Sequence, residues 1–377
     1  MVAFVLSLVY RQMASLSEGL RTLQLQGMLW VAPLQVSKQA LSKRLQTLPA
    51  TVFAQVFSHA WEHHPSPHSS ALIPPPWQPV WERFTAVWVA DASTLEALKR
   101  KLKLLREQAK NPLGGKIMVL QEMLTHVPIK LWYTTNDKAN ERRWCQQLLE
   151  QLPVGGLLVF DLGFFKFAWF DQFTQNQKFF LTRLREKTAY KVTRTLGCGL
   201  YFRDEIVEMG QYRSDPCRHP VRLVSVLWGK DWYCYLTNVL DPQLLSAQQV
   251  CDLYRRRWSI EDSFRIVKRL LGLAYLWVGS TNGVEIQLLA TWMVYTVLND
   301  LCAEIAVALN HPLEVISLEM VFRACAHFAQ ALLTKPAIDL VSYLVEHYQL
   351  LGLVKQKRKR HRADEARSRY IWALCFP

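Results

Sequence analysis

The most informative stretch of this chain is YRRRWSIEDSFRIVKRLL, from Tyr254 to Leu271. Interpreted as one helix that turns about 100° per residue, it places Arg257 at roughly −60° from Tyr254. Glu261 then lies at roughly −20° and Lys268 at roughly −40°, so the four side chains share a stripe about 60° wide and roughly 21 Å long. One carboxylate among cations and a phenol suits a metal ion held beside phosphate groups.

The apolar residues of the same stretch point away from this stripe and predict a face that packs on a core. They are Leu253, Ile260, Phe264, Val267, Leu270 and Leu271. Two other interpretations stay open. Either the charges are merely solvated on an ordinary surface helix, or Ser259 and Asp262 cap a second helix and interrupt the stripe before Glu261.

The composition describes a large globular chain with a basic charge. It has 377 residues, of which 50% are hydrophobic, so it is long enough to bury a large core and is not disordered. The net charge of +14 and the pI of about 9.4 favour a polyanionic partner, nucleic acid first and an anionic membrane second.

Three features argue against a secreted or membrane protein. The cysteines form no CxxC pair and no zinc-binding spacing, as expected for reduced thiols in the cytoplasm. The apolar start MVAFVLSLVY lacks a basic segment and a clear cleavage site, so no signal peptide is predicted. The longest apolar run, Ile286 to Leu298, is shorter than the ~20 residues that span a bilayer, so it predicts a buried helix.

The first 64 residues predict helices, and a linker follows them. In VSKQALSKRLQTL, apolar residues from Val36 to Leu45 are spaced for one helix face. This fits either the docking helix of a small DNA-binding module or an ordinary amphipathic helix. PSPHSSALIPPPWQP, residues 65–79, is too rich in proline for a regular element and predicts a domain boundary.

From Phe84 the pattern alternates between strands and helices. FTAVWVAD predicts a buried strand that ends at Asp91, and Ser93 with Glu96 predicts a capping box for a helix over 94–108. GGLLVFD predicts a strand that ends at Asp161. Further predicted elements are strands in KIMVLQEML, PIKLWYTT and KFFLTRLR, a helix over 138–151, and a helix or loop over 162–173.

Residues 188–240 predict a β-rich region. VRLVSVLW and DWYCYLTN flank Gly229 and Lys230 as a hairpin, with further strands in YKVTRTL and EIVEMGQY. A capping box of Ser246 and Gln249 then begins the helix that leads into Tyr254. Most of 262–350 is helical in pattern, and the basic run KQKRKRHR (355–362) is either a solvated tail or a nonspecific DNA contact.

Asp91 and Asp161 each close a strongly apolar strand, where an ionised carboxylate is costly unless it is paired or binds a metal ion. Either residue alone fits a helix cap or a turn about equally well. Together with Glu261 they form a set that can hold two Mg²⁺ ions about 3.5–4 Å apart. One ion would activate a water or a 3′-hydroxyl, and the other would stabilise the leaving oxygen of an in-line displacement.

The spacing of Tyr254, Arg257, Glu261 and Lys268 also resembles the signature of DDE transposases of insertion-sequence family four, matched without a gap. The neighbouring Trp258 is similar to that family as well. The resemblance covers about residues 36–300. It implies an α/β fold with a ribonuclease-H-like catalytic core, a β-rich insertion and a small helical N-terminal domain.

The other motifs of this family fall in the expected order. Asp91 within DAST resembles the first acidic motif, Asp161 within DLGF resembles the second, and Glu261 is the third. Arg183 within LTRLR resembles a basic position that follows the second motif. The resemblance therefore implies that the three acids are catalytic and bind metal, and that the basic and phenolic positions, Tyr254, Arg257, Lys268 and Arg183, bind DNA.

The resemblance implies cut-and-paste transposition in the cytoplasm, on the nucleoid. A nick at the element's end frees a 3′-hydroxyl, which in relatives forms a hairpin with the opposite strand and later joins target DNA. The implied cofactor is two Mg²⁺, with Mn²⁺ as a substitute. The implied partners are double-stranded DNA (terminal inverted repeats and target) and a second copy of the chain, as a homodimer on paired ends, with no membrane partner.

An aromatic residue of the hairpin is predicted to stack on a displaced base. Trp228 alternates with Val224 and Val226 and so is expected on a buried face, whereas Trp232 lies nearer the exposed tip and is favoured. Ordinary cross-strand packing of these aromatics is the alternative.

These patterns divide the chain into six regions. They are a helical DNA-binding region (1–64), a Pro-rich linker (65–80), the first part of the ribonuclease-H-like core (81–187), the β-rich insertion (188–245), the helical remainder of the core with Glu261 (246–350) and a basic tail (351–377). Two rival functions remain: a nuclease that cuts DNA without joining strands, and an inactive DNA-binding regulator. The presence of all three acids disfavours the regulator.

Overall fold

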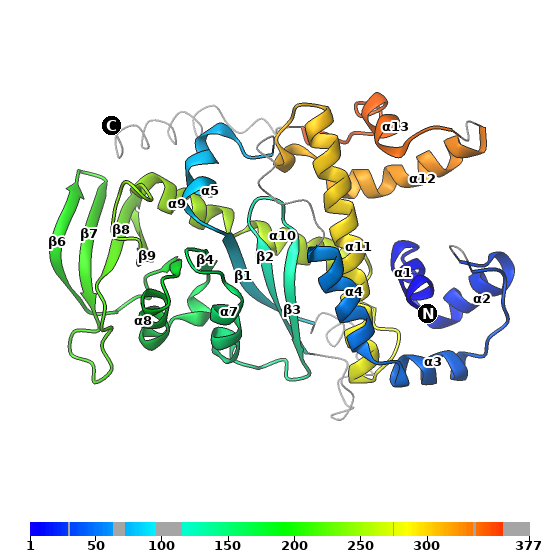
Figure 1. The fold of residues 1–377 in the computed structure, drawn as a ribbon, viewed down its shortest axis with the longest axis horizontal. Coiled ribbons are helices and arrows are strands. Elements are labelled where there is room, and N and C mark those ends of the chain that lie inside the picture. The colour runs from blue at the N-terminus through cyan, green and yellow to red at the C-terminus, as the bar shows by residue number, and fades with distance from the viewer. Residues whose placement is uncertain (29–30, 63–71, 96–114, 274, 335–336, 357–377) are drawn as a thin grey trace.

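One mixed β-sheet runs through most of the molecule, with a body of helices at one end (Figure 1). The computed structural model describes residues 1–28, 31–62, 72–95, 115–273, 275–334 and 337–356. Within these residues the sheet has nine strands in the order β3-β2-β1-β4-β5-β9-β8-β7-β6. The α/β class predicted from the sequence is therefore confirmed.

The first five strands form the half of the sheet that carries the acidic motifs. They are β1 (Val87–Thr94), β2 (Lys116–Glu122), β3 (Pro128–Thr134), β4 (Leu157–Phe160) and β5 (Phe179–Arg183). The pairs β1–β2 and β2–β3 are antiparallel, whereas β1–β4 and β4–β5 are parallel. Because β1 and β4 are parallel neighbours, residues at their carboxyl ends lie at the same edge of the sheet.

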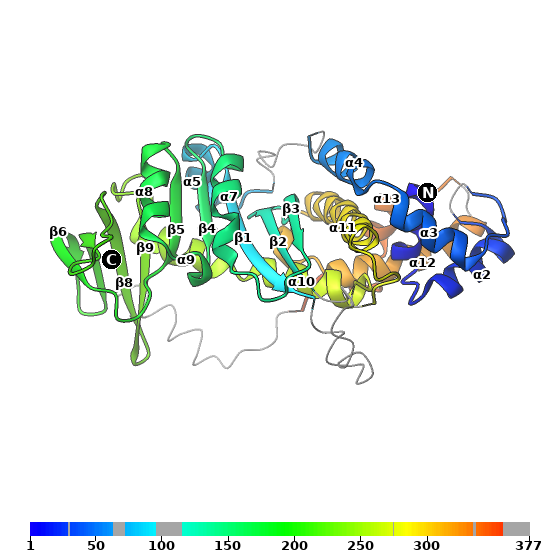
Figure 2. The ribbon, with the colours of Figure 1, turned by 90° about the horizontal axis from the view of Figure 1, so that it is seen from below.

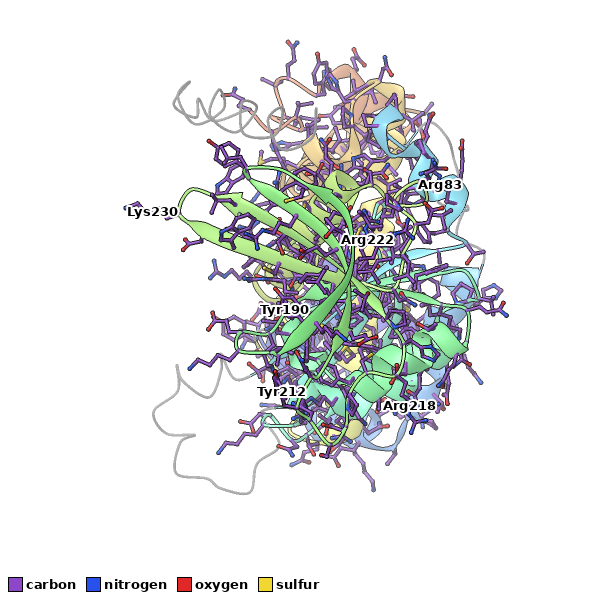
Figure 3. All side chains as sticks on the ribbon, turned by 90° about the vertical axis from the view of Figure 1, so that its left-hand side faces the viewer. Arg83, Tyr190, Tyr212, Arg218, Arg222 and Lys230 are labelled. Carbon is purple, nitrogen blue, oxygen red and sulfur yellow. The ribbon has the colours of Figure 1, made fainter. Side chains whose placement is uncertain are left out.

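The β-rich region is confirmed, and it continues the same sheet. It holds β6 (Tyr190–Cys198), β7 (Phe202–Met209), β8 (Val221–Trp228) and β9 (Asp231–Thr237), all paired antiparallel. β9 pairs with β5 and so joins the two halves. Gly229 turns the β8–β9 hairpin with a φ of 70°, and Lys230 lies at its tip (Figure 3).

A buried ion pair ties this second half to the helix that follows it. The Arg222 side chain is fully buried and donates to both Asp204 oxygens, at 2.7 and 2.6 Å. Its remaining terminal nitrogen donates to the Leu245 carbonyl at 2.6 Å, just before the next helix begins. Figure 3 shows Arg222 within the sheet, far from the hairpin tip.

Each face of the sheet packs on its own set of helices. One face carries η4 (Leu162–Phe164), α7 (Cys145–Gln151) and α8 (Phe167–Gln175), and aromatic side chains of η4 and α8 surround Phe160. The other face carries α5 (Gln78–Arg83), α9 (Ala247–Arg256) and α10 (Ser259–Arg265). β2 and β4 are buried along nearly their whole length, as expected for strands covered on both sides, whereas most of β6 is exposed.

The helical body collects the two ends of the described chain around one long helix. α1 (Val2–Tyr10), α2 (Leu16–Gln26), α3 (Lys38–Thr47) and α4 (Ala50–Glu62) share a core with α11 (Thr281–Ala308). α12 (Leu318–Thr334), η6 (Leu313–Val315) and α13 (Leu340–Glu346) complete it (Figure 2). α11 is long and apolar enough to cross a membrane, but 72% of its most apolar window is buried inside this body.

Several predicted boundaries were wrong. β1 does not end at Asp91 but continues to Thr94, because Ser93 pairs with Ile117 of β2 and so cannot cap a helix. The rest of the helix predicted over 94–108 lies outside the described residues. The helix predicted from 138 begins later, as η3 (Glu141–Trp144) followed by α7. The Pro-rich stretch, taken to lack regular elements, includes η1 (Pro75–Trp77) and the start of α5.

Candidate active site

The informative stretch is two helices and a bulge, so the single-helix interpretation was wrong. The capping box of Ser246 and Gln249 is present and begins α9. α9 ends at Arg256, α10 runs from Ser259 to Arg265, and a π-helical turn, η5 (Ile266–Leu270), follows. Ser259 lies at the predicted break but caps nothing, since its buried hydroxyl has no hydrogen-bond partner among the described residues.

Arg257 lies between two acids that are far apart in the sequence. Its Nη1 donates to Asp91 Oδ2 at 2.9 Å, and its Nη2 donates to Glu261 Oε1 at 3.2 Å. The side chains of Arg257 and Asp91 are almost completely buried, whereas that of Glu261 is 41% exposed. One guanidinium therefore joins the first and third acidic motifs, at the boundary between the core and the solvent.

Asp161 lies at the same edge of the sheet. It directly follows β4, the parallel neighbour of β1, and its Oδ1 accepts the Leu162 amide at 2.6 Å. The pKa of Asp91 is raised to about 7, mainly by burial and in smaller part by the negative charge of Asp161. Arg257 and the Ala92 amide act in the opposite direction. The parallel pairing of β1 with β4 thus brings the two carboxylates to one edge of the sheet.

These three acids fit a divalent metal ion in their chemistry. Carboxylate oxygens are the ligands that Mg²⁺ prefers, and a cationic group already bridges Asp91 and Glu261. The guanidinium thus marks a place where the protein accommodates positive charge between these oxygens. As they stand, the described residues contain no cluster of three His, Cys, Asp or Glu side chains arranged to hold a metal ion.

Buried hydrogen-bond donors without acceptors surround the acids. The Tyr254 hydroxyl, Arg183 Nε and Arg257 Nε have no partner among the described residues. Burial raises the pKa of Tyr254 to about 12, so its hydroxyl remains a donor at neutral pH. An unpaired buried donor is costly, and an anionic oxygen from outside the chain would satisfy it. Tyr254 and Arg257 of the predicted stripe are themselves buried, yet the Tyr254 hydroxyl and Arg257 Nε lack acceptors among the described residues.

Lys268 reaches the same end of β1 from η5. Its Nζ donates to Ser93 Oγ at 2.5 Å and to the Thr94 carbonyl at 2.8 Å. Burial lowers its pKa from the ordinary lysine value. An ammonium group has three donors, so one donor remains beyond these two contacts. Because β1 continues past Asp91, Ser93 and Thr94 are available to hold this lysine.

The sequence did not identify Glu141 as a neighbour of the site. Glu141 accepts from Lys116 at 2.8 Å, and its charge also raises the pKa of Asp91. A Cβ atom on Gly163 would lie 1.8 Å from Glu141 Oε2, so any larger residue at this position would push the Glu141 carboxylate aside. The glycine of DLGF was the available signal, but nothing in the sequence spacing relates it to Glu141.

The two hairpin tryptophans occupy different surroundings. Arg203 lies over Trp232 at 5.3 Å, and Arg255 of α9 lies over Trp228 at 5.8 Å. Trp228 shares its face with Val224 and Val226, which are buried as expected, but 37% of Trp228 itself is exposed. Val226 is the last β8 residue paired with β7, so the hairpin extends beyond its neighbour at Trp228.

Comparison with known proteins places these residues within one matched segment. The family model described as transposase DDE domain matches residues 85–297, which include Asp91, Asp161, Glu261 and Lys268. A probable transposase for insertion sequence element IS5377 of Geobacillus stearothermophilus is 28% identical over 168 residues, 43% of each chain. A protein of Sinorhizobium fredii (strain NBRC 101917 / NGR234), named as the transposase y4zB, is 27% identical over 155 residues.

The second of these matches covers 39% of this chain and 43% of the relative, so the chain spans less than half the length of either relative. Among solved structures, a piggyBac transposase synaptic complex with hairpin DNA is similar at 10% identity, with a TM-score of 0.41. That match covers 96% of this chain and 77% of the other.

Proposed function

The chain belongs to the transposase DDE domain family, and we propose that it cuts the ends of an insertion sequence and joins them to target DNA. One observation carries this proposal. Asp91 and Glu261, which lie far apart in the sequence, share one guanidinium beside Asp161, at the carboxyl end of two parallel strands. Carboxylates that converge in this way suit metal-dependent phosphodiester chemistry.

We assign Asp91, Asp161 and Glu261 as the ligands of two Mg²⁺ ions, with Mn²⁺ as a substitute. When bound, the metal supplies an activated water or 3′-hydroxyl and stabilises the leaving oxygen. Tyr254 and Arg183 offer buried donors without acceptors, which supports their role in holding DNA phosphates. Lys268 adds an ammonium group at the end of β1.

The sheet supports the finer fold assignment. Five strands in the order β3-β2-β1-β4-β5, with the first three antiparallel and β4 and β5 parallel, are the arrangement we propose as a ribonuclease-H-like core. On this proposal 81–187 and 246–350 form the core, and 188–245 is the β-rich insertion. Residues 1–64 bind DNA, 65–80 link them to the core, and 351–377 form a basic tail.

The proposed partners are the terminal inverted repeats, target DNA and a second copy of the chain. Two copies on paired ends would act on the bacterial nucleoid. The Tyr254–Lys268 spacing is the reason for assigning insertion-sequence family four.

The decisive experiment supplies a labelled terminal repeat and a target plasmid with Mg²⁺ or with EDTA. Joined products that require Mg²⁺ would support the transposase. Cutting without joining would favour a nuclease, and DNA binding without cutting would favour a regulator. Glu82→Gln, which neutralises an exposed acid of α5, is the matched control for neutralising one of the three acids of the site.

A further inference from the structure

Arg257 contacts the acids that a metal ion would need. Both of its terminal nitrogens are engaged, one with Asp91 Oδ2 and one with Glu261 Oε1. Resting on the proposed function, we propose that Arg257 and the divalent metal compete for these two carboxylates. Metal loading therefore releases the guanidinium, which then binds a DNA phosphate.

The charges of the buried groups favour this competition. The Asp91 side chain is 13% exposed, and Arg257 is 5% exposed, so each needs a partner of opposite sign. The guanidinium supplies a positive charge to Asp91 and Glu261 together. A divalent cation on the same oxygens would supply more, and it would also repel the guanidinium at close range in a medium of low dielectric constant. The two cations therefore exclude one another.

Arg257 and a metal ion would also need the same oxygen atom of Asp91. Mg²⁺ binds carboxylate oxygens at about 2.0–2.1 Å with strict geometry. Asp91 Oδ1 already accepts the Ala92 amide at 2.8 Å, which leaves Oδ2 as the oxygen facing the site, and Arg257 holds that oxygen. A metal ion that takes Asp91 Oδ2 would share this oxygen with the guanidinium and bring two cations together, and their repulsion favours displacement of the arginine.

Two aromatic rings beside Arg257 give the released side chain a route to the surface. Arg257 lies in the break between α9 and α10, between the rings of Tyr254 and Trp258, at 5.7 and 5.1 Å. Trp258 is 59% exposed, so this aromatic pair extends from the buried acids to the surface. The guanidinium can move outward while it keeps a ring contact. Its Nε and the Tyr254 hydroxyl lack acceptors among the described residues, and a phosphate would satisfy them.

The test measures Mn²⁺ binding to the full chain without DNA, by electron paramagnetic resonance of the free ion. Arg257→Gln should bind Mn²⁺ about tenfold more tightly than the unaltered protein, because a competing charge is removed. Arg256→Gln is the matched control: it removes the same charge one residue away, but Arg256 pairs with Glu314. Its Mn²⁺ affinity should stay unchanged.

Arg257→Lys covers the case in which Arg257→Gln does not fold. Lysine keeps the charge but cannot bridge two carboxylates with a planar fork, so it should also tighten Mn²⁺ binding, to a smaller degree. Circular dichroism shows which variant is folded, and the Mn²⁺ affinity of that variant tests the competition. Mn²⁺ affinity equal to or weaker than that of the unaltered protein would overturn the competition.

A second measurement follows the released side chain. Binding to a cleaved DNA end is measured against salt concentration, once in EDTA and once in Ca²⁺. Arg257→Gln should lower the log–log slope by about one only in Ca²⁺, because only then does Arg257 hold a phosphate. An equal loss of slope in both buffers would contradict the release.

Asp91→Asn distinguishes a failure of the proposed metal site from a failure of the competition alone. If this variant binds Mn²⁺ as well as the unaltered protein, the metal site itself is misplaced, and the proposed function fails with it. If Asp91→Asn abolishes binding but Arg257→Gln does not tighten it, only the competition is wrong.

Discussion

Trp228 and Trp232 lie on opposite faces of the β8–β9 hairpin. Trp232 pairs with Leu227, the residue next to Trp228, and adjacent residues of a strand point to opposite faces. Trp228 shares its face with Val224 and Val226, which belong to the core beneath α9. That is also the face of Arg257 and Asp91, so Trp228 lies on the side of the acids and Trp232 on the side away from them.

Trp228→Ala should therefore slow hairpin formation at the DNA end and leave the first nick intact. A displaced base that stacks on an aromatic ring gains about 1–3 kcal/mol, which corresponds to roughly a tenfold slower step or more when it is lost. A labelled end resolved on a denaturing gel separates nicked from hairpin product. Trp232→Ala is the control of equal chemistry, and a defect in Trp232→Ala alone would restore the assignment made from the sequence.

Glu261→Gln should abolish Mg²⁺-dependent cleavage and spare DNA binding. The amide has nearly the same shape but is neutral and binds metal poorly. Asp91→Asn and Asp161→Asn should behave alike, and the triple variant should be no worse than each single one, because the acids act as a unit. Cleavage by Glu261→Gln at the normal rate, in the presence of Mg²⁺, would refute the site.

Lys268→Ala should weaken binding to cleaved ends and lower the salt slope by roughly one. The structure provides a control, because Lys268 donates to Ser93. Ser93→Ala removes that contact but keeps the charge, so its slope should match that of the unaltered protein. If both variants lose affinity without any change in slope, Lys268 holds the end of β1 instead of a phosphate.

Part of this site could be predicted from the sequence because its signals are local. Apolar runs that end in an acid marked β1 and β4, and Ser246 with Gln249 marked the start of α9. Each depends on neighbours only a few residues away.

The remainder depends on contacts between distant residues. The sequence around Arg257 and Trp258 was compatible both with a continuous helix and with a break at Ser259, and it gave no sign that Arg257 pairs with Asp91 in another element. β1 similarly extends past Asp91 because β2 pairs with it. The exposure of Trp228 depends on where β7 ends, and alternation within β8 does not contain that information.

Asp204→Asn should destabilise the protein by about 3–5 kcal/mol, because it leaves the buried Arg222 charge uncompensated. Urea unfolding measures this cost. Replacing both partners with apolar residues, as Asp204→Leu with Arg222→Met, should recover much of it. The exposed pair Arg213–Asp215 is the control, and Asp215→Asn should leave the free energy of unfolding essentially unchanged. A small effect of Asp204→Asn would mean that the Leu245 carbonyl alone compensates the guanidinium.

His126 should make the protein less stable as the pH falls from about 6.5 to about 4. It lies in the turn between β2 and β3 with a φ of 59°, and it lines a cavity of about 830 Å³ together with Arg256 and Lys355. Burial lowers its pKa to about 4, and the charges of Lys355 and Arg256 act in the same direction. The unfolded chain, with a histidine pKa near 6.5, takes up a proton in this range before the folded chain does.

The contribution of neutral His126 to the free energy of unfolding is thus fully present above pH 6.5. It is lost toward pH 4, by up to about 3 kcal/mol. His126→Asn removes the titrating ring and tolerates the left-handed backbone. The difference in unfolding free energy between this variant and the unaltered protein should therefore change between pH 7 and pH 4.5, in favour of the variant at low pH. His311→Asn, which replaces an exposed histidine in the same way, is the control. It shows how much the free energy of unfolding changes over this pH range because carboxylates titrate there. A constant difference across this range would show that His126 takes up its proton in the folded protein as readily as in the unfolded chain.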